Sequence, residues 1–207
     1  MRLASAALDH LVLATPDLAA TTAWVSEQTG VVASAGGRHI GRGTRNMLCS
    51  LGRSSYLEII GPDPEQTDVD GGRPFGIDTL DDARIVSWAI AVLDIDAAVE
   101  AAREDGFDPG EVFSMQRQRP DGVVLSWRLT VSDSATTPFL IDWLDTVQHP
   151  ALDSAPGLEL GELQAQHPDP ASLTLRLEAL GVIMGVALGP EALLVELRGP
   201  LGALEFA

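Results

Sequence analysis

The sequence has no lysine, one cysteine and no long apolar run. Because lysine is absent, no side chain can form a lysine Schiff base, and the lysine-containing phosphate loop of nucleotide-binding proteins is excluded. The single cysteine, Cys49, cannot form a disulfide within the chain, which fits a reducing compartment. Cys49 lies in an apolar run, so we interpret it as a small buried side chain rather than a nucleophile.

Positive charge is also scarce. The 13 basic residues are all arginines and stand against 30 acidic residues, so the net charge is −17. Nucleic acid and anionic membrane are therefore poor partners, because both would be repelled. No segment approaches the roughly 20 apolar residues of a membrane span. The chain reaches Asp9 and His10 before a signal-peptide core could form, so we expect a cytoplasmic protein.

What the chain does contain is a repeated order of strands and helices. The first copy predicts a strand at 8–14, a helix at 18–28 that Asp17 caps and Gly30 ends, and strands at 31–34, 44–51 and 56–60. The second copy predicts a strand at 86–93, a helix at 95–105, and strands at 111–116, 123–131 and 138–144. Residues 10–18 align without gaps on 87–95, and YLEII (56–60) aligns on LIDWL (140–144). The repeating unit is therefore βαβββ.

A third copy is predicted after residue 156. Residues 160–171 align without gaps on 8–19, and a helix at 170–180 precedes strands at 183–188, 193–197 and 203–206. We expect a two-module domain over 1–150, with modules at about 8–61 and 85–145, and a third module over 156–207. The acidic, Gly- and Pro-rich stretch 62–84 and the stretch 146–157 have the composition of linkers, which can also fold over a pocket as lids.

Residues 8–145 resemble the glyoxalase/bleomycin-resistance, or vicinal oxygen chelate, superfamily, and more narrowly its glyoxalase-like domain. The stretches that carry the resemblance are LDHLVLATPDL, GGRHIGRGTRN, YLEII and PFLIDW followed by His149–Pro150. The resemblance implies an α+β fold. Repeated βαβββ modules would form a half-open curved sheet with the helices on its outer face.

The resemblance also implies a metal site on the first and last strands of the two modules. His10 and Glu58 occupy these positions in module one, and Ser87 and Asp142 occupy them in module two. Serine is a poor ligand, which leaves His10, Glu58 and Asp142 for one divalent Zn, Ni, Fe or Mn ion, with Glu58 and Asp142 as catalytic carboxylates. The alternative is a cup without metal in which His10 and Glu58 hydrogen-bond each other.

Arginines gather in the glycine-rich segment 36–45, a local reversal of charge in a very acidic chain. Guanidinium groups suit a carboxylate or phosphate, so this segment is either an anion-binding rim or a solvated hairpin whose arginines pair with acidic neighbours. The residues expected to contact a small molecule are Arg38, His39, Arg42, Arg45, Asn46, Trp127 and His149. Trp127 has a core position as its alternative, and His149 an exposed turn.

Two functions follow from these patterns. The first is a metal-dependent lyase, isomerase or dioxygenase of glyoxalase type. The second is a metal-free protein that binds or sequesters a small molecule, as antibiotic-resistance proteins do. The apolar third module has one uncovered face in this scheme, so we predict a homodimer through 158–207, with packing of that face within the chain as the competing outcome.

Overall fold

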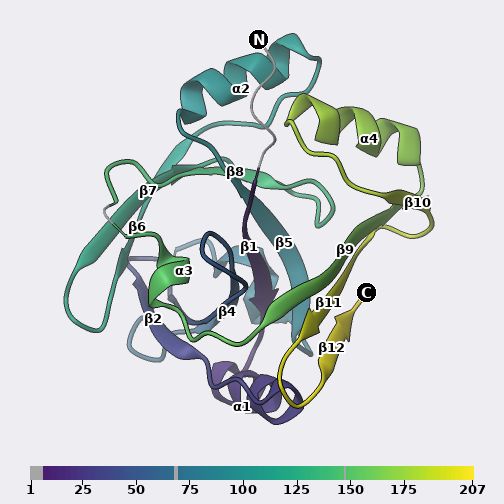
Figure 1. Ribbon diagram of the computed structural model, residues 1–207. Coiled ribbons are helices and arrows are strands. Elements are labelled where there is room, and N and C mark those ends of the chain that lie inside the picture. The colour runs from purple at the N-terminus through teal and green to yellow at the C-terminus, as the bar shows by residue number, and fades with distance from the viewer. Residues whose placement is uncertain (1–6, 68–69, 147) are drawn as a thin grey trace.

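The computed structural model describes residues 7–67, 70–146 and 148–207 (Figure 1). Module one consists of β1 (Ala7–Ala14), α1 (Leu18–Thr29), β2 (Ser34–His39), β3 (Thr44–Ser50) and β4 (Tyr56–Pro62). The side chain of Asp17 accepts a hydrogen bond from the backbone of Ala20 and so caps α1, which ends at Gly30 in the left-handed conformation. The predicted βαβββ order is confirmed.

Module two repeats this order after a short 3₁₀ helix, η1 (Pro74–Thr79). Its elements are β5 (Arg84–Ala91), α2 (Ile95–Glu104), β6 (Phe113–Gln118), β7 (Val124–Leu129) and β8 (Phe139–Asp142), and α3 (Pro150–Asp153) follows. Asp94 caps α2 as Asp17 caps α1. Within the described ranges, no helix has the length and apolar character needed to cross a membrane.

The eight strands of the two modules form one curved sheet in the order β1-β4-β3-β2-β6-β7-β8-β5. The modules meet twice, where β1 pairs with β5 and where β2 pairs with β6. The second seam is short, with Arg38 opposite Gln118 and His39 opposite Arg117. The predicted fold of curved βαβββ modules is confirmed, and this seam closes the sheet into a barrel.

One strand of module one lies elsewhere than predicted. The second strand was expected at 31–34, with a glycine-rich loop after it, but β2 runs through that loop from Ser34 to His39. Gly36 and Gly37 are poor strand formers in isolation. They are accommodated because β3 and β6 pair with β2 on either side. Side chains of these strands fill the space beside Gly36, and the backbone of β6 approaches Gly37 closely.

Module three has the same element order but a different sheet. It comprises β9 (Glu159–His167), α4 (Pro170–Ala179), β10 (Val186–Leu188), β11 (Ala192–Arg198) and β12 (Ala203–Phe206). The strand order is β10-β9-β11-β12, so the first strand of this module pairs with its second and third strands, whereas in modules one and two it pairs with the fourth. Sequence similarity between the copies therefore predicts the elements but not their pairing.

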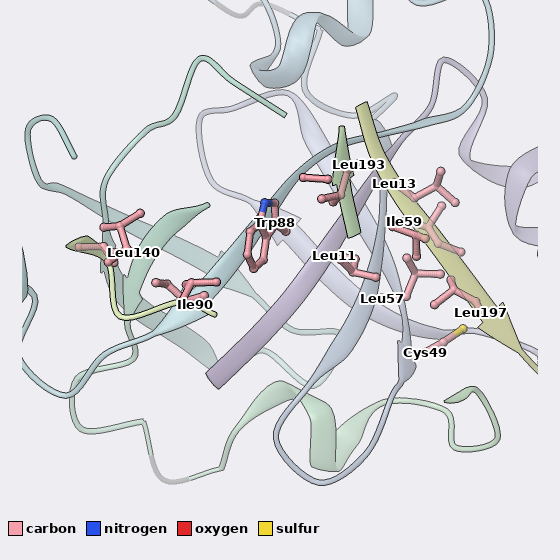
Figure 2. Close-up of a cluster of buried hydrophobic side chains, with 14 of the residues drawn as sticks. Leu11, Leu13, Cys49, Leu57, Ile59, Trp88, Ile90, Leu140, Leu193 and Leu197 are labelled. Atoms are coloured by element: carbon pink, nitrogen blue, oxygen red, sulfur yellow. The ribbon is translucent and has the colours of Figure 1, made fainter. Parts of the chain in front are cut away.

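The apolar face of module three packs against the outside of the barrel. Leu193 and Leu197 of β11 share one buried cluster with Leu11 of β1 and Ile59 of β4 (Figure 2). This is the competing outcome that we set against the homodimer. The argument for a homodimer rested on an uncovered apolar face and an unpaired sheet edge. The face is covered within the chain, β10 and β12 remain at the edges of their sheet, and the homodimer stays a prediction.

Candidate functional site

The interior of the barrel holds a cavity of about 610 Å³. This volume lies in the usual range for sites that bind small organic molecules. Much of the wall is aromatic or aliphatic, including Phe113, Met115, Trp127, Phe139 and Ile141. The polar part of the wall comes chiefly from β1, β2, β3, β4 and β6, and its members contact one another in a single network.

A bulge in β1 brings two consecutive side chains into this network. The pairing of β1 with β5 shifts register between Leu8 and His10, so Asp9 is the extra residue. At a bulge, the strict alternation of side chains between the two faces of a strand is interrupted. Asp9 and His10 therefore both lie in the interior, with exposed fractions of 0% and 4%.

Asp9 is a buried carboxylate with three hydrogen-bond donors. His10 Nδ1 lies 2.6 Å from Oδ1, while Trp143 Nε1 and His149 Nε2 each lie 2.9 Å from Oδ2. Burial alone would raise the pKa of Asp9, but the hydrogen bonds from His10 and His149 outweigh it and lower the pKa from 3.8 to about 2. Asp9 is thus an anion at neutral pH.

The contact with Asp9 fixes the orientation of His10. An ionised carboxylate can only accept, so neutral His10 carries its proton on Nδ1 and leaves Nε2 as an acceptor. Nε2 lies 3.8 Å from Glu58 Oε2, and the ring stacks on Tyr56 with a centroid distance of 4.8 Å. The predicted approach of His10 to Glu58 is therefore observed.

Glu58 is also held by neighbours on β2 and β3. Asn46 Nδ2 donates to Glu58 Oε1 at 2.5 Å, and His39 Nε2 lies 3.5 Å from the same oxygen. Burial lowers the pKa of His39 from 6.5 to about 4, with Glu58 opposing and Arg117 supporting the shift. His39 is therefore neutral at pH 7. The carboxamide oxygen of Asn46 accepts from Arg117 Nη1 at 3.1 Å.

Asp142 does not join this site, and its prediction as a metal ligand and catalytic carboxylate is wrong. Its carboxylate accepts hydrogen bonds from the backbone of Ile95, at the start of α2, and of Leu144. The alternate residues Phe139 and Ile141 of β8 line the cavity instead. Asp142 lies on the opposite face of β8, where it supports the first turn of a helix.

Strand register explains the error. Glu58 pairs with Val12, two residues after His10. The equivalent residue of module two, two positions after Ser87, is Ala89, and it pairs with Phe139. Module two therefore presents Ser87 and Phe139 where module one presents His10 and Glu58, and neither is a good metal ligand.

The residues present do not fit a metal ion. In the ranges that the structure covers, no group of three or more His, Cys, Asp or Glu side chains has the geometry of a metal site. His39 stands near Glu58, but the amide of Asn46 already occupies Glu58 Oε1. The buried guanidinium of Arg117 adds positive charge beside this network, which disfavours a divalent cation.

The residues predicted to contact a small molecule fall into three groups. His39, Arg42, Asn46 and Trp127 line the cavity. Arg38 and Arg45 do not, because they lie on a separate surface depression, where Arg38 pairs with Asp63 and Glu65. The ion pairs of Arg38 agree with the alternative of a solvated hairpin whose arginines pair with acidic neighbours.

His149 lies behind the site rather than on its wall. It caps α3 by accepting a hydrogen bond from the backbone of Ala151 on Nδ1, which leaves Nε2–H to donate to Asp9.

Sequence reasoning missed several residues of the site, among them Asp9, Arg117 and Phe75. Asp9 adjoins His10 in the sequence, but only the bulge brings both side chains to the same side. Arg117 is not among the residues that the sequence singles out, and Phe75 lies in the stretch 62–84 that was predicted to be a linker. The segment around Phe75 lies at the cavity wall, as a lid would, and Phe75 has a φ of 60°.

Comparison with known proteins agrees with this architecture. The sequence profile described as "Glyoxalase-like domain" matches residues 8–181. No curated protein matches the chain.

Solved structures give distant matches. A hypothetical protein from Staphylococcus aureus is 14% identical with a TM-score of 0.61, and the match covers 96% of this chain and 84% of that one. Methylmalonyl-CoA epimerase from Mycobacterium tuberculosis is 19% identical with a TM-score of 0.46, over 70% of this chain and 95% of that one. The likeness to the Staphylococcus aureus protein shows a shared fold and nothing about function.

Proposed function

The chain belongs to the glyoxalase-like domain family of the vicinal oxygen chelate superfamily, and from this premise we propose that its cup binds a small organic molecule and transfers a proton on it without a metal ion. The observation that carries the proposal is the Asp9–His10 pair. Asp9 holds Nδ1 of His10, and Nε2 is left as an acceptor beside the cavity. An imidazole oriented in this way is suited to act as a general base.

In the proposed reaction, His10 Nε2 removes a proton from a carbon next to a carbonyl group of the bound molecule. The electron pair of the broken C–H bond moves towards the carbonyl oxygen and forms an enolate. Return of the proton from His10 to the same carbon regenerates the molecule, with its hydrogen exchanged in D₂O. Where the reacting carbon carries a hydroxyl group, His10 instead returns the proton to the former carbonyl carbon while the hydroxyl proton passes to the enolate oxygen, and this completes an isomerisation. If a leaving group departs from the adjacent carbon instead, the reaction is an elimination, which belongs to the lyases.

Ser87 is suited to stabilise the enolate. Its hydroxyl is buried, lines the cavity and has no hydrogen-bond partner among the described residues. A buried hydroxyl without a partner is costly, and a ligand oxygen would supply the missing bond. In this proposal, the serine that departs from the expected ligand pattern donates to the developing oxyanion.

Solvent-deuterium exchange tests this function. A panel of neutral ketones and oxo acids with acidic C–H bonds is incubated with the protein in D₂O, and loss of the C–H signal is followed by proton NMR. We expect at least one compound to exchange faster than in buffer, with no effect of prior chelator treatment. His10→Gln should slow this exchange roughly 10²- to 10⁴-fold, and His167→Gln, outside the cavity, should not. Exchange that stops after chelation would refute the metal-free mechanism.

A second candidate function is sequestration without turnover. The aromatic wall favours it, since Trp127 and Trp143 lie 5.2 Å apart, centre to centre, and offer a surface for stacking. This candidate predicts stoichiometric binding of a compound that shows no C–H exchange and is released unchanged. Absence of exchange across the whole panel, together with such binding, would favour sequestration over proton transfer.

A further inference from the structure

Arg117 is a buried cation without an ion pair. Its exposed fraction is 4%, and no carboxylate of the described residues lies within 4.0 Å of its guanidinium nitrogens. Its one side-chain hydrogen bond goes from Nη1 to the amide oxygen of Asn46. A guanidinium has five N–H donors and stays protonated, so most of its capacity is unused. Burial of a charge in this state is costly unless a ligand completes the site.

The backbone leaves space for Arg117. A Cβ atom on Gly36 would lie 2.2 Å from Asn46 Oδ1 and 2.4 Å from Arg117 Nη1. A Cβ atom on Gly37 would lie 2.2 Å from the backbone oxygen of Gln118, so this glycine serves the close approach of β6. Gly36 therefore leaves a space, which we call the cradle, that the guanidinium and the Asn46 amide occupy and that any side chain at this position would fill. This cradle is a second feature, independent of the missing ion pair, that places the guanidinium at the cavity wall.

The other charged groups on the cavity wall are Arg42, Glu58 and Asp133. Arg42 is exposed and forms no ion pair with a described residue, so it adds a second positive charge. Glu58 is engaged by Asn46, and Asp133 is exposed to solvent. In a chain of net charge −17, this cavity thus holds two arginines without a carboxylate partner.

The wall beside Arg117 changes from charged to apolar along one strand. Phe113, Met115 and Arg117 alternate along β6 and all line the cavity. Met115 lies opposite Trp127 of the neighbouring antiparallel strand β7. Residues two apart on a strand lie about 6.7 Å from each other. A molecule of ring size could therefore reach from the guanidinium to the apolar stripe.

We propose that the ligand is an organic carboxylate with an apolar, ring-sized body. Its carboxylate binds the free edge of the Arg117 guanidinium, with Arg42 adding positive charge, and its body lies against Met115 and Trp127. The planar fork of arginine matches a carboxylate through two parallel hydrogen bonds. This inference rests on the proposed small-molecule function of the cup and adds the chemical class of the ligand.

The test is equilibrium binding followed by tryptophan fluorescence, with three probes of similar shape. These are 3-phenylpropanoate, its neutral amide 3-phenylpropanamide, and 2-phenylethylphosphonate. We expect the carboxylate to bind at least tenfold more tightly than the amide and more tightly than the phosphonate. Arg117→Gln should remove the preference for the carboxylate over the amide. Arg117→Lys, which keeps the charge but loses the fork, should retain part of it.

The matched control is Arg119→Gln. Arg119 is two residues along the chain and pairs with Asp121 and Asp153 outside the cavity, so this variant should keep the full preference. Equal binding of carboxylate and amide by the wild type would overturn the inference, as would an unchanged preference in Arg117→Lys and Arg117→Gln. Tighter binding of the phosphonate would overturn the carboxylate assignment. This binding experiment measures no turnover. Absence of C–H exchange would therefore refute the proton-transfer proposal without changing the measured preference for the carboxylate.

Discussion

The indole of Trp143 donates a hydrogen bond of 2.9 Å to Asp9, and this contact joins the two modules beside the seam at which β1 pairs with β5. Asp9 belongs to the first strand of module one, and Trp143 follows the last strand of module two. The same carboxylate orients His10, which faces the cavity. The position of the proposed base therefore depends on a contact from module two as well as on its own strand.

Replacement of Asp9 by Asn should destabilise the protein at neutral pH. A carboxyl whose pKa falls from 3.8 to about 2 on folding stabilises the folded state by about 2 kcal/mol above pH 4, and this contribution is lost as the pH falls towards 2. Urea unfolding at pH 7 and pH 3 should show a large difference between wild type and Asp9→Asn at the first pH and a smaller one at the second. Asp81→Asn, at an exposed site, is the control. Equal stabilities at pH 7 would contradict the role of Asp9.

His39 should make the stability depend on pH over a different range. Its pKa is lowered on folding from 6.5 to about 4, so the unfolded chain takes up this proton first. The contribution of neutral His39 is complete above about pH 6.5 and is lost as the pH falls from 6.5 to 4. The slope of unfolding free energy against pH should flatten in His39→Gln over this range, and remain in His167→Gln. An unchanged slope in His39→Gln would show that His39 titrates normally in the folded protein.

Asp142→Ala should affect stability but not ligand binding. Asp142 accepts the backbone N–H of Ile95 at the start of α2, and loss of such a contact at a helix start typically costs about 1 kcal/mol. Its side chain lies outside the cavity, so affinity for a bound probe should equal that of wild type. A large loss of affinity at unchanged stability would restore Asp142 to the site.

Gly36→Ala should disturb the Arg117–Asn46 contact. The added methyl group would overlap both side chains, and overpacking of this kind commonly costs about 1–3 kcal/mol. We expect lower stability in thermal unfolding and weaker binding of 3-phenylpropanoate. Gly185→Ala is the matched control, because its Cβ would meet only one atom, at 4.0 Å. Wild-type binding by Gly36→Ala would mean that Arg117 does not need its cradle.

The sequence was sufficient to predict the fold and the His10–Glu58 pair of the site. The strand–helix order was predictable because Asp17, Asp94 and Asp169 each cap a helix that follows a strand. His10 and Glu58 were predictable as neighbours because their strands occupy matching places in the repeat.

Register and long-range contacts were not predictable in this way. The alignment of YLEII on LIDWL placed Asp142 opposite Glu58, whereas backbone pairing places Phe139 there. A repeat with few identities permits such shifts, and a shift by an odd number of residues exchanges the two faces of a strand. The Arg117–Asn46 contact spans 71 residues and depends on the seam between β2 and β6. No local pattern encodes that seam.

Metal content tests the central claim of a metal-independent cup most directly. The protein is purified without chelator or affinity metal, incubated with Zn²⁺, Ni²⁺, Mn²⁺ or Fe²⁺, desalted, and analysed by inductively coupled plasma mass spectrometry beside His10→Ala. Our account predicts far less than one metal ion per chain in both proteins, since Ser87 and Phe139 replace the second pair of ligands. About one ion per chain in the wild type, lost in His10→Ala, would contradict it.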